Sequence, residues 1–309
     1  LNVWRWITGA PESEFSDLAA RVPSLLASGL AVVLLFRLIG IARGVAWLAV
    51  LLALHPWHLR YGVEARAYAL IVPLCLSAIL ASRRVITTRG RDWKAWAWLA
   101  INQGVWVWTF MLSAIDVGML FLVTGYLLWK NETHSRDRIT VLMRHVVAHV
   151  FAMMLWVQAF LPNFVQIPHW NEPNHVPQLM DASLARQTFS QLLFGMEWQH
   201  DQPGAVESAG LTSLTEQAGG GALAGSVAIV LAFGIALIGL RVATKRTPVT
   251  GLLLLAPLLS AVAFIILGKV LHLMFYPRFI ISLLPVIIAG WALFPLVLSD
   301  YVQKQRWIA

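Results

Sequence analysis

The sequence predicts an all-α integral membrane protein: a polytopic bundle of about nine transmembrane helices with one long extracytoplasmic loop. Of the 309 residues, 59% are hydrophobic and 12% are charged, and the mean hydropathy is +0.70. This is more apolar than a soluble domain of that length. Fifteen Trp residues, several at the ends of apolar runs, favour anchoring at a membrane interface. The single Cys75 lies within an apolar run, so neither a disulfide framework nor a thiolate metal site is predicted.

Apolar runs recur along the whole chain, each close to the roughly 20 residues that cross the hydrocarbon core as a helix. Helices are expected because a backbone in lipid must satisfy its own hydrogen bonds. We expect one transmembrane domain over residues 1–309 without an internal repeat. The predicted spans are 22–39, 42–59, 67–83, 95–112, 114–129, 145–162, 222–240, 250–268 and 279–298.

The charged residues between these spans predict the orientation. Alternate connections hold 16 of the 23 Lys and Arg residues but only four acids, which are Asp92, Glu132, Asp137 and Asp300. By the positive-inside rule these connections are cytoplasmic. The basic character of the chain therefore reflects topology, and no nucleic-acid partner is predicted. We expect a multi-pass protein of the inner (plasma) membrane.

The opposite, extracytoplasmic face is predicted to hold residues 1–21, the 55–66 connection, the 163–221 loop and the 269–278 connection. The 163–221 loop is far longer than an ordinary connection, which favours a lid or acceptor-binding cap over the alternative of a disordered spacer. Within it, Ser183–Met196 has the pattern of an amphipathic helix on the membrane surface, with Leu192 and Leu193 among the residues facing lipid.

The chain opens with Leu1, on the predicted outer face and just before a span. Because polytopic proteins usually enter the membrane from the cytoplasm, we expect a first helix and part of the first outer loop to precede it.

Cations at the outer membrane edge carry the functional prediction, because the positive-inside rule does not call for them there. They are Arg60, Arg66, Lys269 and Arg278, with Arg21 at the mouth of the first span. A guanidinium group grips two phosphate oxygens at once, so such a cluster suits a phosphate-bearing ligand. The alternative is snorkelling of these side chains to ordinary lipid headgroups.

Several motifs resemble one family of membrane enzymes. They are Ser13-Glu14-Phe15, Arg21-Val22-Pro23-Ser24, Leu54-His55-Pro56, the run from Tyr61 to Leu70 (Tyr-Gly-Val-Glu-Ala-Arg-Ala-Tyr-Ala-Leu), and Tyr276-Pro277-Arg278-Phe279 with Pro285. Together they resemble the polyprenyl-phosphate-dependent type C glycosyltransferases of the protein O-mannosyltransferase and aminoarabinose-transferase kind. The resemblance is densest over residues 9–82 and recurs over 276–290.

The resemblance implies transfer of a sugar from a polyprenyl-phosphate donor to a lipid, protein or glycan acceptor on the extracytoplasmic face. Such a reaction needs a carboxylate as general base and cations or oriented donors at the departing phosphate. In the family the principal acid lies in the first outer loop, which would precede Leu1. Glu64 is then the second acidic position, and Glu12, Glu14 and Asp17 are weak substitutes for the first.

The resemblance also implies the remaining roles. Arg66 and Arg278 are expected to bind the donor phosphate with support from Arg60 and Lys269, and Tyr61, Tyr68 and His58 are expected to contact the substrate. A structural ion pair of Glu64 with Arg66 or Arg278 is the alternative. No cofactor is predicted, because no compact spacing of ligands supports a metal site.

Other polar residues within or beside the spans have simpler interpretations. Asp116 is expected to cap the helix that follows the tight outer turn. Asn102 and Gln103 are expected to hydrogen-bond between helices, and His145 and His149 to pack. The middles of the spans otherwise carry few polar groups, which argues against a transporter. A non-catalytic lipid-binding scaffold of the same fold remains the main alternative.

Overall fold

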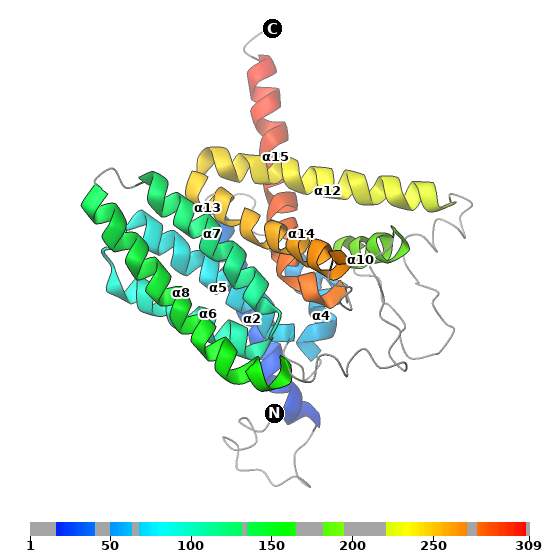
Figure 1. The fold of residues 1–309 in the computed structure, drawn as a ribbon. Helices are drawn as coiled ribbons and strands as arrows, with labels where there is room; N and C mark the ends of the chain where they lie inside the picture. Colours follow the sequence, from blue (N-terminus) through cyan, green and yellow to red (C-terminus); the bar gives the residue numbers. More distant parts are fainter. Residues whose placement is uncertain are drawn as a thin grey trace.

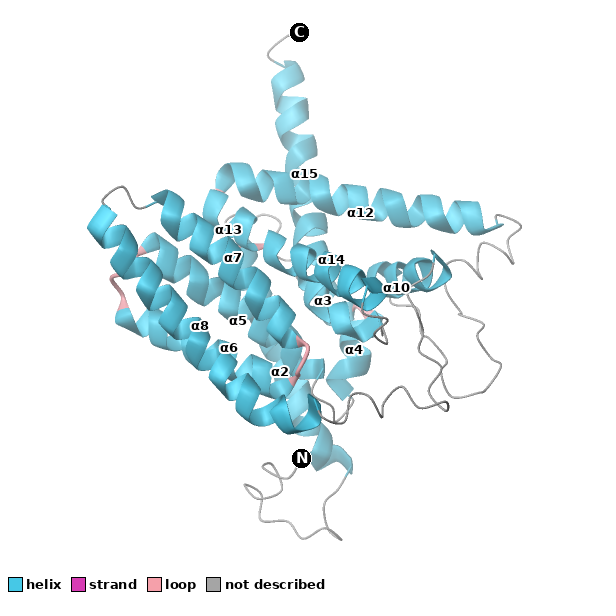
Figure 2. Ribbon diagram, in the orientation of Figure 1, coloured by secondary structure: helices cyan, strands magenta, loops and turns pink. Residues whose placement is uncertain are grey.

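A computed structural model describes residues 17–40, 50–63, 68–131, 135–164, 182–194, 221–270 and 277–306. These residues form helices and the turns between them, and no strand occurs among them (Figure 2). Seven helical segments of this part of the chain are long and apolar enough to cross a membrane. The protein is therefore a polytopic helical membrane protein, as the composition predicted.

The N-terminal half begins with α2 (Asp17–Ile39), α3 (Val50–Leu54) and α4 (Pro56–Val63). It continues with α5 (Tyr68–Thr87), α6 (Trp93–Thr109), α7 (Ser113–Asn131) and α8 (Ser135–Phe164). Helix α5 lies at the centre, packed against α2, α6 and α7, and most of its side chains are buried (Figure 1). Helix α8 covers α6 and α7 and exposes most of its surface, as expected of a helix that faces lipid.

The C-terminal half holds α10 (Ala182–Phe194), α12 (Gly221–Arg246), α13 (Pro248–Leu253) and α14 (Leu255–Val270). The 3-10 helix η3 (Pro277–Leu283) then leads directly into α15 (Leu284–Arg306). Helices α12 and α15 form the most extensive helix pair, and α14 packs on α7. The far end of α15 extends beyond α12, and the C-terminus lies at its tip (Figure 1).

The predicted span 42–59 is not one continuous helix. Residues 41–49 lie outside the described part of the chain, and the rest is divided at His55 into α3 and α4. The cause is Pro56, which has no backbone N–H to donate and disfavours helical geometry at the preceding residue. Pro56 instead begins α4, where its fixed φ is favourable.

Two other predicted boundaries also differ. Helix α6 has 17 residues, which is about 26 Å of helix and shorter than the roughly 30 Å hydrocarbon core. Helix α8 begins ten residues before the predicted start at position 145. Its first turns carry Arg136, Arg138 and Arg144, whose long side chains can reach the interface while the backbone stays helical. The apolar pattern alone therefore placed this start too late.

Candidate functional site

The candidate site lies at the end of the bundle that the charge pattern assigns to the outside. Helix α4 packs here against α2, α5 and α10, and η3 packs against α5, α10 and α14. Segments from the 55–66 connection, the 163–221 loop and the residues after α14 thus meet, although they lie far apart in the chain. In Figure 1, α4, α10 and the end of α14 lie together at the right of the bundle.

A row of aromatic side chains joins these segments. The ring of Tyr61 in α4 lies 5.5 Å from that of Tyr68, the first residue of α5. The Tyr68 ring lies 5.6 Å from Phe110, which ends α6, and Phe110 lies 5.6 Å from Phe279 in η3. Tilted and edge-on contacts of this kind add to the energy of burial. The row therefore fixes where α4, α5, α6 and η3 stand relative to one another.

Three of the predicted site residues are not described in full. Glu64 and Arg66 lie in 64–67, outside the described residues, and for Arg278 only the backbone, within η3, is described. The residues that flank them are placed. Tyr61 and Tyr68 bracket the 64–67 connection, and Phe279 follows Arg278, so the aromatic row brings both flanks to the same region.

Two of the other predicted cations lie at the ends of their helices. Arg60 is half-buried in the last turn of α4, and Lys269 is exposed in the last turn of α14. A cation in the last turn of a helix interacts favourably with the helix dipole. This structural role is available to both residues whether or not they bind a ligand.

His58 faces the protein interior. Its Nε2 donates to the backbone oxygen of Ser28 in α2 at 3.2 Å, and the side chain is only 4% exposed. Gly62 lies on the same side of α4, where an added Cβ would collide with the Ser28 side chain. His58 thus joins α4 to α2. His58 was expected to contact the substrate, and this hydrogen bond already occupies one of its two ring nitrogens, Nε2.

His55 lies where α4 meets α10. Its ring faces the backbone at Leu192 and Leu193 near the end of α10, but neither ring nitrogen has a partner within hydrogen-bonding geometry among the residues that the structure describes. The imidazole is therefore enclosed between the two helices.

Helix α10 confirms one prediction and corrects another. A helix does form over Ala182–Phe194, close to the predicted 183–196. Its Leu192 and Leu193 were expected to face lipid, which is wrong, because they are 0% and 2% exposed against the protein. Phe189 of α10 also packs edge-on against Phe233 of α12, with ring centres 5.6 Å apart. An amphipathic pattern shows that one face is apolar but does not say whether lipid or protein covers it.

Asp116 is a buried polar residue whose role sequence reasoning missed. It lies in the first turn of α7 and was expected to cap that helix. Instead it is 2% exposed, and its Oδ1 accepts a hydrogen bond from Ser282 Oγ in η3 at 2.8 Å. Ser260 of α14 also lies beside the carboxyl group, while Oδ2 has no partner among the described residues. The only signal in the sequence was an acidic residue inside an apolar run with no cation near it.

Ser282 is held from a second side by Cys75 of α5. The Cys75 Sγ lies 4.0 Å from the Ser282 carbonyl oxygen, as a weak donor. A narrow internal space lined by Cys75, Trp106, Asp116 and Pro257 lies beside this contact. Polar groups from α5, α7 and α14 therefore converge on η3 at Ser282, three residues after Phe279 of the aromatic row.

The polar residues of α6 and α8 behave as predicted. Gln103 Nε2 donates to His149 Nε2 at 2.9 Å, and Asn102 Nδ2 donates to the Leu74 carbonyl at 2.8 Å, so both residues join helices. His145 Nε2 donates to the Phe121 carbonyl at 3.0 Å, and its ring stacks on that of Phe121. The interior nevertheless holds more polar groups than the sequence indicated, because Asp116 and this cluster are both buried.

No group of three or more His, Cys, Asp and Glu residues in the described ranges is arranged to hold a metal ion. Comparison with known proteins gives no relative, because no protein-family model, curated protein or solved structure matches the chain.

Proposed function

We propose that this protein is a membrane glycosyltransferase that moves a sugar from a polyprenyl-phosphate donor to a lipid, protein or glycan acceptor on the extracytoplasmic face. The observation that supports it best is the aromatic row. It holds the start of η3, which carries Arg278, beside the two flanks of the connection that carries Glu64 and Arg66. On this basis we infer that Arg66, Arg278 and Glu64 share one end of the bundle, where a phosphate-linked sugar needs cations and a carboxylate.

In this proposal Arg66 and Arg278 bind the donor phosphate, and Arg60 and Lys269 add positive charge around it. An acceptor hydroxyl attacks the anomeric carbon, the bond from that carbon to the phosphate oxygen breaks, and polyprenyl phosphate leaves. The configuration of that carbon is inverted. Glu64 orients the acceptor or holds Arg66, and a carboxylate acting as general base takes up the proton of the hydroxyl. Tyr61 and Tyr68 supply hydroxyl groups to the sugar or phosphate.

The architecture that goes with this function has nine crossings in the inner (plasma) membrane. The short α6 and the 42–59 stretch add two crossings to the seven candidate spans. The 163–221 loop lies outside as a cap, and α10 is its docked part. Helix α10 packs on α4 and η3, which supports a cap beside the proposed site.

The experiment measures two steps with the protein in lipid nanodiscs: binding of polyprenyl phosphate, and its release from a polyprenyl-phosphate sugar. Arg66→Ala and Arg278→Ala should weaken binding by roughly tenfold or more, since each removes a charge-assisted contact. Glu64→Gln should slow release while leaving binding nearly unchanged. Arg136→Ala, which removes one cation from the predicted cytoplasmic end, is the matched control and should change neither step.

Each outcome has a clear reading. If neither arginine substitution weakens binding of polyprenyl phosphate, the proposed donor site is wrong. If binding depends on Arg66 and Arg278 but the unaltered protein does not release polyprenyl phosphate from the sugar, the protein is a lipid-binding scaffold of the same fold and not an enzyme.

A further inference from the structure

The turn between α5 and α6, residues 88–92, is a second charged feature, and it lies at the end of the bundle opposite the candidate site. The charge pattern assigns this end to the cytoplasm. Five cations lie in or beside the turn, namely Arg83, Arg84, Arg89, Arg91 and Lys94, against the single acid Asp92. The arrangement of the turn determines which of these charges stay available to a ligand.

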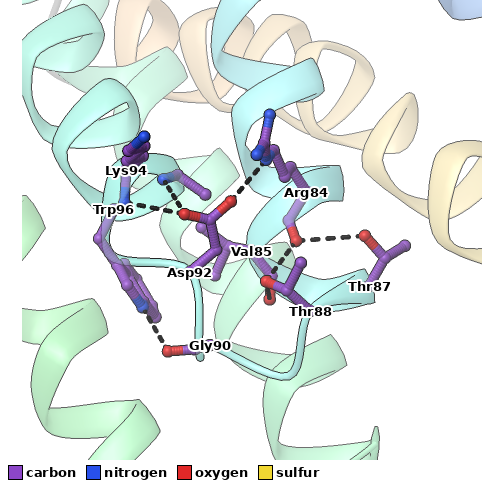
Figure 3. A network of polar contacts seen from close by, with 9 residues as sticks. Arg84, Val85, Thr87, Thr88, Gly90, Asp92, Lys94 and Trp96 are labelled. Carbon is purple, nitrogen blue, oxygen red and sulfur yellow. Dashed lines mark hydrogen bonds and ion pairs between the residues drawn. The ribbon is translucent and has the colours of Figure 1, made fainter.

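The backbone of the turn is held in one conformation. Arg89 and Gly90 both have positive φ, of 51° and 65°, and Arg89 is the one non-glycine residue of the described chain in that region. The Gly90 amide donates to the Val85 carbonyl at 2.8 Å. The Gly90 carbonyl in turn accepts from Trp96 Nε1 at 2.9 Å and from Arg144 Nη1 of α8 at 3.0 Å. Figure 3 shows the Trp96 contact.

The one acid of the turn is already engaged. Asp92 Oδ1 accepts from the backbone amides of Lys94 and Ala95, at 2.9 and 3.4 Å, and so caps the start of α6. Its Oδ2 pairs with Arg84 Nε at 2.6 Å (Figure 3). The hydrogen bond from Arg84 lowers the pKa of Asp92. Asp92 and Arg84 therefore balance each other, and neither compensates the remaining cations.

Four cations are left over. Arg83 is half-buried in α5, and we call the other three, Arg89, Arg91 and Lys94, the turn cations. All three are exposed, and no residue of the described ranges forms an ion pair with them. Trp93, between Arg91 and Lys94, is 71% exposed. An exposed indole beside cations at the end of apolar helices is typical of the headgroup layer of a membrane.

We propose that the α5–α6 turn is a binding site for the headgroup of an anionic phospholipid, with the turn cations around its phosphate and Trp93 at headgroup level. Guanidinium and ammonium groups suit phosphate oxygens. Basic surfaces at the cytoplasmic ends of membrane helices attract anionic lipids. The ligand is a lipid rather than a soluble phosphate because Trp93 and the half-exposed Trp98 continue the surface toward the hydrocarbon. This site is independent of the proposed transferase activity.

The first test asks whether lipid binding depends on the turn cations in particular or on the positive charge of that face in general. Retention of phosphatidylglycerol against phosphatidylcholine is measured by native mass spectrometry of the detergent-solubilised protein. The triple substitution Arg89→Gln, Arg91→Gln and Lys94→Gln should reduce retention at least about tenfold. The matched control Lys130→Gln, Arg136→Gln and Arg241→Gln removes the same charge from the same predicted face and should change retention less than about twofold. Equal losses in the two variants would overturn the proposal.

The second test changes the geometry but not the charge. Gly90→Ala places a side chain at φ 65° and against the Val141 methyl groups, with the added Cβ 3.0 Å from them. It should weaken phosphatidylglycerol retention severalfold, whereas Gly118→Ala, where a Cβ meets nothing within 4 Å, should not. Unchanged retention in a folded Gly90→Ala protein, or displacement of the lipid by an equal concentration of inorganic phosphate, would also overturn it.

Discussion

Ser282 and Asp116 are 166 residues apart in the chain, yet the hydroxyl of one lies 2.8 Å from the carboxyl oxygen of the other. The bond joins η3 to α7 in the interior of a membrane protein, where water is not available to replace a missing partner. Both side chains are almost fully buried. Because η3 begins with Pro277 and Arg278, the bond also fixes the segment that the proposed donor site uses.

Replacing Ser282 by Ala should therefore destabilise the protein by roughly 1–3 kcal/mol, because the buried Asp116 Oδ1 loses its donor. Asp116→Asn should cost less, since the amide oxygen can still accept the Ser282 hydrogen bond. Thermal unfolding in detergent measures both. Binding of polyprenyl phosphate should weaken in Ser282→Ala as well, as η3 loosens. A Ser282→Ala protein as stable as the original would show that the bond contributes little.

The crossing of α12 and α15 depends on two glycines. A Cβ at Gly239 would overlap the backbone carbonyl of Gly290, and one at Gly290 would overlap that of Ala236. Small residues let membrane helices approach this closely. Gly239→Ala should destabilise the pair by about 1–3 kcal/mol, because the backbone on the other helix must move away. The measurement is the midpoint of thermal unfolding in detergent.

Gly234 on the same helix provides the control. Nothing lies within 4 Å of a Cβ added there, so Gly234→Ala should leave the stability unchanged or raise it through better helix propensity. If Gly239→Ala and Gly234→Ala changed the stability equally, helix propensity would explain the effect and the close contact of α12 with α15 would not.

The hydrophobic runs predicted most of the helices, because the length of a run and the need to satisfy the backbone in lipid are local properties. The division at His55 was missed because Pro56 stands inside an otherwise apolar run. The orientation of α10 was missed for a different reason. Leu192 and Leu193 look the same in sequence whether lipid or α4 and η3 cover them, and only the tertiary structure distinguishes the two.

The candidate site was predictable in its segments but not in its contacts. Unusual charge at the outer edge pointed to the 55–66 and 269–278 connections, and η3 does pack beside the start of α5. The bond between Asp116 and Ser282 joins distant parts of the chain, and no local pattern encodes it. His58 was predicted to contact the substrate, but its direction toward Ser28 depends on how α4 crosses α2.

The link between α6 and α8 gives a further prediction. Gln103→Leu leaves His149 Nε2 without its donor in a buried position, because the other ring nitrogen already donates to the His145 carbonyl at 2.9 Å. We expect a loss of stability of about 0.6–1.7 kcal/mol, the range found for hydrogen bonds between membrane helices. The double variant Gln103→Leu, His149→Leu should recover part of the loss, since no polar group is then left unpaired. If the change in unfolding midpoint of the double variant equals the sum of the changes in the two single variants, the two side chains are not coupled.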